Sequence, residues 1–193
     1  MFVRVRGPQR STQGRSSEAA DGYTRQEIAV SGDGALEDGA LVRLATLENN
    51  GDVRRHFPIL ADTLNILSNR RVRNVATVGG NLAHGDPHMD LPPVLMALDA
   101  SVEATGPNGS RAIPIGELFT GYYETSLSPD ELISGLSVPA QAGRVSAYGK
   151  CTTRSAHDWP ALGAALSPDS AGGTGRGARC AGTARTETPT GRG

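Results

Sequence analysis

Hydrophobic residues are concentrated in the middle of the chain, and both ends are polar. The first part is rich in Gly, Ser, Gln and Arg, and after Leu166 there is no Leu, Ile, Val, Met, Phe, Trp or Tyr. A segment without large apolar side chains cannot bury enough surface to offset the entropy that is lost on ordering. The pattern predicts a poorly ordered N-terminal segment over 1–32, a globular domain over 33–166 and a disordered Gly/Ala/Arg/Thr-rich tail over 167–193.

Two segments of the central part have the apolar spacing of a helix. The first is 57–67, with Pro58 suited to the first turn. Its apolar residues at helical spacing are Phe57, Leu60, Leu64 and Leu67. The second helix is expected to begin near Asp90, a good N-cap residue, with Pro92 in its first turn.

Short runs of apolar and β-branched residues predict strands before and after these two helices. The runs are 27–30, 41–44, 101–105, 111–115, 132–138 and 144–150. The sequence Gly-Pro-Asn-Gly at 106–109 predicts a hairpin turn that joins two of them. Because strands joined by hairpins are mixed with helices, we expect an α+β fold rather than a doubly wound parallel sheet.

Charge and cysteine content exclude several classes of protein. The formal net charge of -1 gives no bulk electrostatic attraction to nucleic acid or anionic membranes. No run approaches the ~20 apolar residues of a transmembrane helix, and no apolar run follows the basic N-terminus as in a secretory signal. Cys151 and Cys180 are too far apart for a zinc ribbon or a cluster motif. We therefore expect a cytoplasmic protein that binds no nucleic acid.

The segment 75–90 contains the densest set of residues with binding chemistry. The pair Gly79-Gly80 allows positive φ angles or the close approach of a ligand, and its N–H groups suit phosphate oxygens. Thr77 adds a hydroxyl donor and Asn81 an amide, and Asp90 could accept a hydrogen bond from a ribose or base. The alternative is a purely structural tight turn between a strand and a helix.

The same segment also allows a metal site to be considered. His84, Asp86, His88 and Asp90 alternate, as ligands do along an extended segment, and would then share one face of a strand. Pro87 argues against a regular strand. A small metal-dependent hydrolase built on these side chains would also lack a Glu/His pair elsewhere to activate a nucleophile. We therefore expect no metal and interpret His88 as a surface residue.

The order of motifs in this region resembles a known family. The sequence T-V-G-G-N at 77–81, followed by A-H-x-D-P-x-x-D-L-P at 83–92, resembles the FAD-binding subunit of molybdenum hydroxylases. These include the medium subunits of aerobic carbon monoxide dehydrogenase and of xanthine dehydrogenase-like enzymes. Further matches are V-R-N at 72–74, F-T-G-Y-Y-E-T at 119–125, P-D-E-L-I at 129–133, Y-G-K at 148–150, Arg154 and H-D-W-P at 157–160. The resemblance covers about 33–166.

The resemblance implies the second subdomain of a two-lobed, PCMH-type FAD-binding domain. In such complexes FAD relays electrons from iron–sulfur clusters on a small subunit to an acceptor, and a large molybdenum-cofactor subunit handles the substrate. By similarity, Asp90 would bind a polar group of the cofactor and Ile133 would pack against it. Lys150 would lie near the isoalloxazine, where a cation stabilises reduced flavin. The remaining cofactor-binding residues would be Ala76, Thr77, Val78, Gly79, Gly80 and Asn81; no catalytic residue is assigned.

Two departures from the family pattern lead to further expectations. Residues 1–40 contain no match to the glycine loop that holds the FAD pyrophosphate from the other side, and the resemblance ends at Leu166. Both departures suggest a truncated or frameshifted gene, which reading the DNA in the other frames would test. Because each missing charge-assisted hydrogen bond is worth roughly 1.5–3 kcal/mol, we expect weak or absent FAD binding by the isolated chain. The alternative function is a non-catalytic interaction module or an inactive gene remnant.

Overall fold

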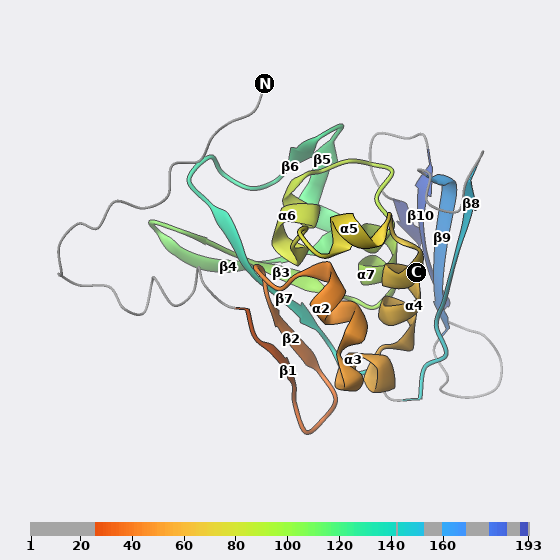
Figure 1. Cartoon of the computed structure of the whole chain (residues 1–193). Helices are drawn as coiled ribbons and strands as arrows, with labels where there is room; N and C mark the ends of the chain where they lie inside the picture. Colours follow the sequence, from red (N-terminus) through yellow and green to blue (C-terminus); the bar gives the residue numbers. More distant parts are fainter. Residues whose placement is uncertain (1–25, 142, 153–159, 169–177, 185–189, 193) are drawn as a thin grey trace.

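A five-stranded antiparallel sheet forms one outer layer of the fold in the computed structural model (Figure 1). The structure describes residues 26–141, 143–152, 160–168, 178–184 and 190–192. The strand order is β1-β2-β7-β3-β4, and each neighbouring pair is antiparallel. The strands are β1 (Ile28–Val30), β2 (Leu36–Gly39), β3 (Ser101–Gly106), β4 (Gly109–Pro114) and β7 (Leu132–Val138). The architecture confirms the α+β class expected from the sequence.

Seven helices lie within the described residues. They are α2 (Leu44–Asn49), α3 (Gly51–His56), α4 (Pro58–Ile66), α5 (Arg70–Arg73), α6 (Val78–Ala83), α7 (Leu91–Ala97) and α8 (Ile115–Leu118). Leu60 and Leu64 of α4 are fully buried, as the helical spacing predicts, and so are Val94 and Leu95 of α7. None of the helices within the described residues has the length and hydrophobicity of a membrane-spanning segment.

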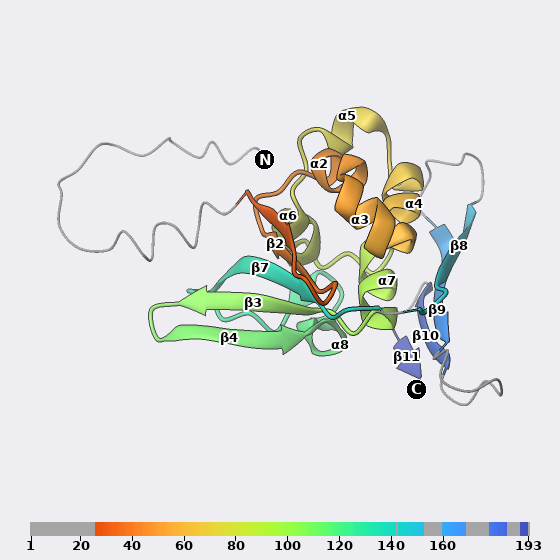
Figure 2. The same ribbon diagram turned by 90° about the horizontal axis from the view of Figure 1, so that it is seen from below.

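A second sheet of four strands packs on the other side of the helices (Figure 2). Its order is β11-β10-β9-β8, with β8 (Ala147–Thr152), β9 (Pro160–Pro168), β10 (Ala178–Ala184) and β11 (Thr190–Arg192). Helix α7 contacts β9 and β10, and α4 contacts β8. Helices α4 and α7 therefore lie between the two sheets. A short hairpin of β5 (Phe119–Gly121) and β6 (Glu124–Thr125) stands beside α6.

Helices α4 and α7, strand β7 and the hairpin at 106–109 confirm the sequence predictions. The strand predicted at 41–44 is wrong. Leu44 begins helix α2, and the preceding strand is β2 at Leu36–Gly39. The reason is that Leu44 and Leu47 are both buried on one face of α2, a helical spacing that a four-residue apolar run does not reveal.

The C-terminal end of the chain differs from the expectation of disorder. At the other end, residues 1–25 lie outside the described residues, and the strand predicted at 27–30 is observed as the edge strand β1 at 28–30. In the predicted tail over 167–193, β10 pairs with β9 along its whole length, and β11 pairs with β10. Composition fails here because backbone hydrogen bonds in a sheet do not need large side chains. The rest of this tail lies outside the described residues.

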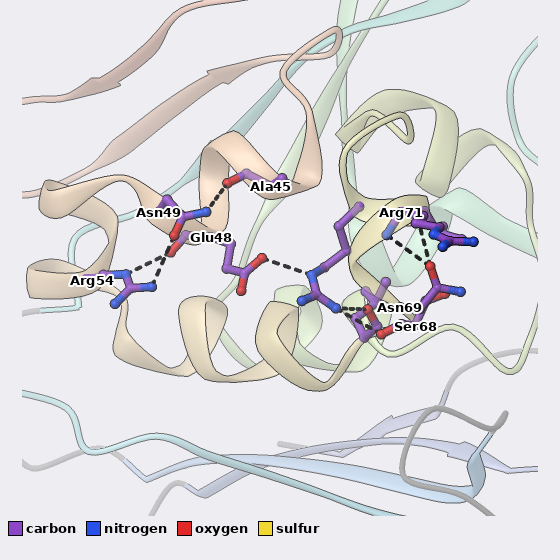
Figure 3. A network of polar contacts seen from close by, with 10 residues as sticks. Ala45, Glu48, Asn49, Arg54, Ser68, Asn69 and Arg71 are labelled. Carbon is purple, nitrogen blue, oxygen red and sulfur yellow. Dashed lines mark hydrogen bonds and ion pairs between the residues drawn. The ribbon is translucent and has the colours of Figure 1, made fainter.

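A buried ion pair connects three of the helical segments (Figure 3). Arg73 Nε donates to Glu48 Oε2 at 2.9 Å, and both side chains are almost inaccessible to solvent. Arg73 Nη1 also donates to the carbonyls of Leu67 and Ser68, at 3.0 and 2.8 Å. One guanidinium therefore holds α2, the carboxyl end of α4 and α5 together.

Candidate functional site

The segment 76–81 runs beside 40–44 and then turns into helix α6. Arg43 and Thr77 form an antiparallel bridge. The flanking backbone hydrogen bonds are Leu44 N to Ala76 O (3.0 Å), Val78 N to Val42 O (2.9 Å) and Gly79 N to Ala40 O (2.8 Å). Thr77 is the N-cap of α6, since its Oγ1 accepts from Gly80 N at 3.1 Å. The segment is thus fixed by contacts that do not involve a ligand.

The glycine pair serves close packing and does not supply a positive φ. Neither Gly79 nor Gly80 is among the residues with positive φ. A Cβ on Gly79 would lie 2.7 Å from the Ala40 Cβ, and one on Gly80 would lie 2.9 Å from Thr77 Oγ1. Their N–H groups are already bonded to Ala40 O and Thr77 Oγ1, and Asn81 N donates to Thr77 O. The expected cradle of exposed N–H donors is therefore not present in this conformation.

Replacing Gly79 by alanine should destabilise the chain by about 1–3 kcal/mol, because the new Cβ meets the Ala40 Cβ and carbonyl and the backbone must shift. Urea unfolding measures the effect. The matched control is Gly51→Ala, where no atom lies within 4 Å of the new Cβ. Equal stability of both variants would contradict the close packing of α6 on Ala40.

Three groups of this turn keep capacity to bind a ligand. Asn81 Oδ1 is buried and has no hydrogen-bond partner within the described residues. The Thr77 hydroxyl accepts one bond and can still donate its own proton. Gly80 is exposed, and its missing Cβ leaves the first turn of α6 open to close approach. A buried acceptor without a partner is costly, so Asn81 marks a place where a donor is expected.

Asp90 and Lys150, two further predicted site residues, lie together but bind each other. Lys150 Nζ contacts Asp90 Oδ2 at 3.2 Å and donates to Ile66 O at 2.8 Å. Tyr148 donates to Asp90 Oδ1 at 2.6 Å, and both charged side chains are less than a tenth exposed. Burial, with the adjacent Asp90 carboxylate, raises the pKa of Tyr148 far above its usual value. Asp90 occupies the N-cap position of α7 but makes no capping bond, because its oxygens face β8.

Tyr148 was not predicted as a member of this group. Residues two apart on a strand point to the same face, so Tyr148 follows from Lys150 once β8 is known to be a strand. The remaining predicted residue, Ile133, lies on β7, is partly buried and packs against the core. No hydrogen bond or ion pair among the described residues connects Asp90 and Lys150 with the Thr77–Asn81 turn.

Asp86 is the centre of a separate polar cluster just after the C-terminal end of α6. Its carboxylate accepts hydrogen bonds from the Tyr123 hydroxyl at 2.6 Å and from His88 N at 2.8 Å. It also contacts His88 Nδ1 at 3.0 Å. Burial opposes ionisation of Asp86, but these hydrogen bonds outweigh it and hold its pKa below the usual value. The same contact raises the pKa of Tyr123 to about 12. The cluster ties the β5–β6 hairpin to the end of α6.

The geometry around Asp86 differs from the alternating metal site that was considered above. Residues 84–90 form turns and a loop, not a strand, and Asp90 faces Lys150 instead of Asp86. His84 Nε2 lies 3.9 Å from Asp86 Oδ2 and is exposed. Within the described part of the chain, no group of three or more His, Cys, Asp or Glu side chains is arranged to hold a metal ion.

Comparison with known proteins places this turn in a family. A family model described as the FAD binding domain in molybdopterin dehydrogenase matches residues 26–141. Subunit alpha of the 6-hydroxypseudooxynicotine dehydrogenase complex from Paenarthrobacter nicotinovorans is 39% identical over 107 residues, 55% of this chain and 36% of that protein. The carbon monoxide dehydrogenase medium chain of Hydrogenophaga pseudoflava is 34% identical over 148 residues, 73% of this chain and 51% of that protein.

The solved structures agree with this placement. The structure of a carbon monoxide dehydrogenase from Hydrogenophaga pseudoflava, in a form that lacks the Mo-pyranopterin moiety of its cofactor, is similar with a TM-score of 0.81 at 34% identity. The match covers 86% of this chain and 57% of the other.

This chain belongs to the family of FAD-binding domains found in molybdopterin dehydrogenases. The match confirms the resemblance that the motifs indicated, and with the fold it confirms the expected class of domain. The matched residues begin earlier than the predicted boundary at 33 and end before 166. The chain spans 36% and 51% of the lengths of the two curated relatives.

Proposed function

We propose that this chain supplies one wall of an FAD site in a medium subunit of the molybdenum hydroxylase type. FAD, when bound, supplies the redox chemistry and relays electrons from iron–sulfur clusters to an acceptor. The partners would be a small iron–sulfur subunit and a large molybdenum-cofactor subunit. The names of the relatives, a subunit of a dehydrogenase complex and a medium chain, support such an assembly. The cytoplasmic location expected from the sequence stays a prediction.

The observation that carries this proposal is the unpartnered acceptor Asn81 Oδ1 at the open first turn of α6. The pyrophosphate of FAD has only acceptor oxygens and cannot satisfy it. The ribose and ribityl hydroxyls and the flavin imide are donors and can do so. The residues therefore fit FAD, but with a hydroxyl-bearing or imide part at Asn81. The Thr77 hydroxyl remains free to donate, and exposed Gly80 allows the cofactor to lie against the backbone.

The roles inferred from the resemblance change for Asp90 and Lys150. Both side chains are less than a tenth exposed, and they already bond to each other, to Tyr148 and to Ile66. Breaking a buried pair that is satisfied on both sides is costly. We infer that these two are positioning residues, which hold β8 against the start of α7. Ile133 stays a proposed packing residue, and Ala76, Val78 and Gly79 shape the turn through their backbone.

Replacing Asn81 by leucine should separate ligand binding from folding. The substitution removes an acceptor that has no partner, so the unliganded chain should gain about 1 kcal/mol of stability. FAD should bind about 5- to 30-fold more weakly, since a bond to a buried acceptor is worth roughly 1–2 kcal/mol. Thermal unfolding and titration of flavin fluorescence measure the two effects.

The matched control for Asn81 is Asn65→Leu, at an exposed position of α4. It should leave FAD binding unchanged. If Asn81→Leu binds FAD as tightly as the unchanged chain, Asn81 does not contact the cofactor and the proposal fails. If it unfolds the chain, Asn81 has a structural partner and the argument from its free oxygen is wrong.

The strength of FAD binding distinguishes this function from the alternative, a non-catalytic interaction module. The family match over 26–141 favours the cofactor domain. Because 1–40 contains no match to the family's first glycine loop, the weak binding expected from the sequence stays our prediction for the isolated chain. If the chain is purified with a stoichiometric flavin spectrum, the prediction of weak FAD binding is wrong. If it binds no FAD at millimolar concentration, the non-catalytic interaction module is favoured.

A further inference from the structure

The outer face of the five-stranded sheet carries a trough with a volume of about 590 Å³. Strand register places the small residues of four strands on this face, while Leu36, Val102 and Leu136 point into the core. The floor is made of Gly39, Gly135, Ser101, Ser137 and Ala112. Because these side chains are short, the backbone of another segment can approach the sheet closely.

Acidic side chains line this trough without cationic partners. Glu27, Glu37 and Glu103 are exposed and border it. Glu37 accepts from the Ser137 hydroxyl at 2.8 Å, and Glu103 from the Ser134 hydroxyl at 3.1 Å. Within the described residues, none of the three carboxylates forms an ion pair with Lys or Arg.

Among the described residues, Arg111 is the cation that borders the trough, and its charge is already compensated. Arg111 binds both carboxylate oxygens of Glu131 through Nε and Nη2, each at 2.8 Å. This bidentate ion pair lies at the edge of the sheet that strand β4 forms. The rest of the trough therefore keeps a net negative charge, which an arginine-rich segment would complement.

The same chain carries such a segment directly before the sheet. The first 17 residues contain no Asp or Glu, and their cations are Arg4, Arg6, Arg10 and Arg15. These residues lie outside the part that the structure describes. The chain enters the sheet at Glu27, which itself lines the trough. The stretch from Arg15 to Glu27 can reach roughly 40 Å, whereas the five strands span only about 19 Å.

We propose that the trough binds the arginine-rich segment 1–16 of its own chain. Its guanidinium groups pair with Glu27, Glu37 and Glu103, and its backbone lies over the small residues of the floor. Tethering through 17–26 makes the contact intramolecular, so weak individual ion pairs suffice at a high effective concentration. The segment covers this face of the sheet and excludes other basic polypeptides from it.

Paramagnetic relaxation in the full chain tests this contact. A spin label is attached to Thr12→Cys in a Cys151→Ser/Cys180→Ser background, and amide signals are recorded on the ¹⁵N-labelled chain. We expect broadening at Ala29, Ala112 and Gly135 that 0.5 M NaCl relieves, since exposed ion pairs are screened by salt. In the variant Glu27→Gln/Glu37→Gln/Glu103→Gln the ratio of docked to free segment should fall about tenfold, the effect of three exposed pairs.

The matched control is Glu117→Gln, an exposed carboxylate on α8 that does not line the trough. It should leave the broadening unchanged. Broadening that is absent from the trough, or that neither salt nor the triple variant reduces, would overturn the proposal. Broadening that appears only between a spin-labelled chain and a separate ¹⁵N-labelled chain would also overturn it and would assign the trough to a second copy.

Discussion

Replacing Arg73 by methionine should lower the free energy of unfolding by about 3–5 kcal/mol, because it leaves the Glu48 carboxylate buried without its cation. The same change removes the donor to Leu67 O and Ser68 O at the carboxyl end of α4. Both effects act on the helical layer that supports the Thr77–Asn81 turn. Urea unfolding at pH 7 measures this loss. The slope of the free energy of unfolding against urea concentration should stay unchanged.

An exposed ion pair provides the control for Arg73. Arg55 and Asp52 lie 3.8 Å apart with side chains 75% and 62% exposed. Arg55→Met should change the stability by no more than about 1 kcal/mol. If Arg73→Met costs no more than Arg55→Met, the Glu48–Arg73 pair does not hold the helices together.

Replacing Asp38 by leucine should stabilise the chain at pH 8. Asp38 is 2% exposed, and neither of its oxygens has a partner within the described residues. On β2 its neighbours in register are Ile28 and Leu136, so its surroundings are apolar. Burial raises the pKa of Asp38 to about 8. The difference from 3.8 corresponds to at most on the order of 6 kcal/mol.

The direction of the pH dependence follows from the raised pKa. In the unfolded chain Asp38 ionises near 3.8, while in the folded chain it keeps its proton up to about pH 8. The unfolded state thus binds fewer protons between about pH 4 and 8, and the free energy of unfolding falls as pH rises through this window. Asp38→Leu and Asp38→Asn should both flatten this slope, and the exposed Asp62→Asn should not. A slope that survives in both Asp38 variants would contradict the assignment.

Long segments with a clear apolar period were predictable from the sequence, and short ones were not. In helix α4 and strand β7 the spacing of apolar residues is regular along the whole element. The predicted bounds of both were therefore close to the observed ones. Strand β2 was missed because Asp38 stands at an inward position, where the alternating pattern requires an apolar residue. The short apolar run at 41–44 was then mistaken for the strand.

The binding turn was found by its motif, but its conformation was not. The glycine pair was expected to form a turn whose N–H groups face phosphate, whereas the structure has the first turn of helix α6 at this place. The helix forms because tertiary contacts to Ala40 and the Thr77 cap fix the backbone there. Those contacts use the N–H groups that the sequence had assigned to phosphate.

Contacts between polar residues far apart in the chain could not be predicted from a sequence pattern. Asp90 meets Lys150 and Tyr148 only because the second sheet packs against the helices. Asp86 likewise meets Tyr123 through the β5–β6 hairpin. The sequence supplied the residue types of these groups, and their partners required the tertiary fold.

The contact between FAD and the first turn of α6 is tested most directly by titrating FAD into the ¹⁵N-labelled chain and following its amide signals, a measurement that also detects weak binding. We expect saturable shifts at Thr77, Gly80 and Asn81, including the Asn81 side-chain amide. Shifts at other sites alone, or none at millimolar FAD, would contradict the claim that this turn forms one wall of the FAD site.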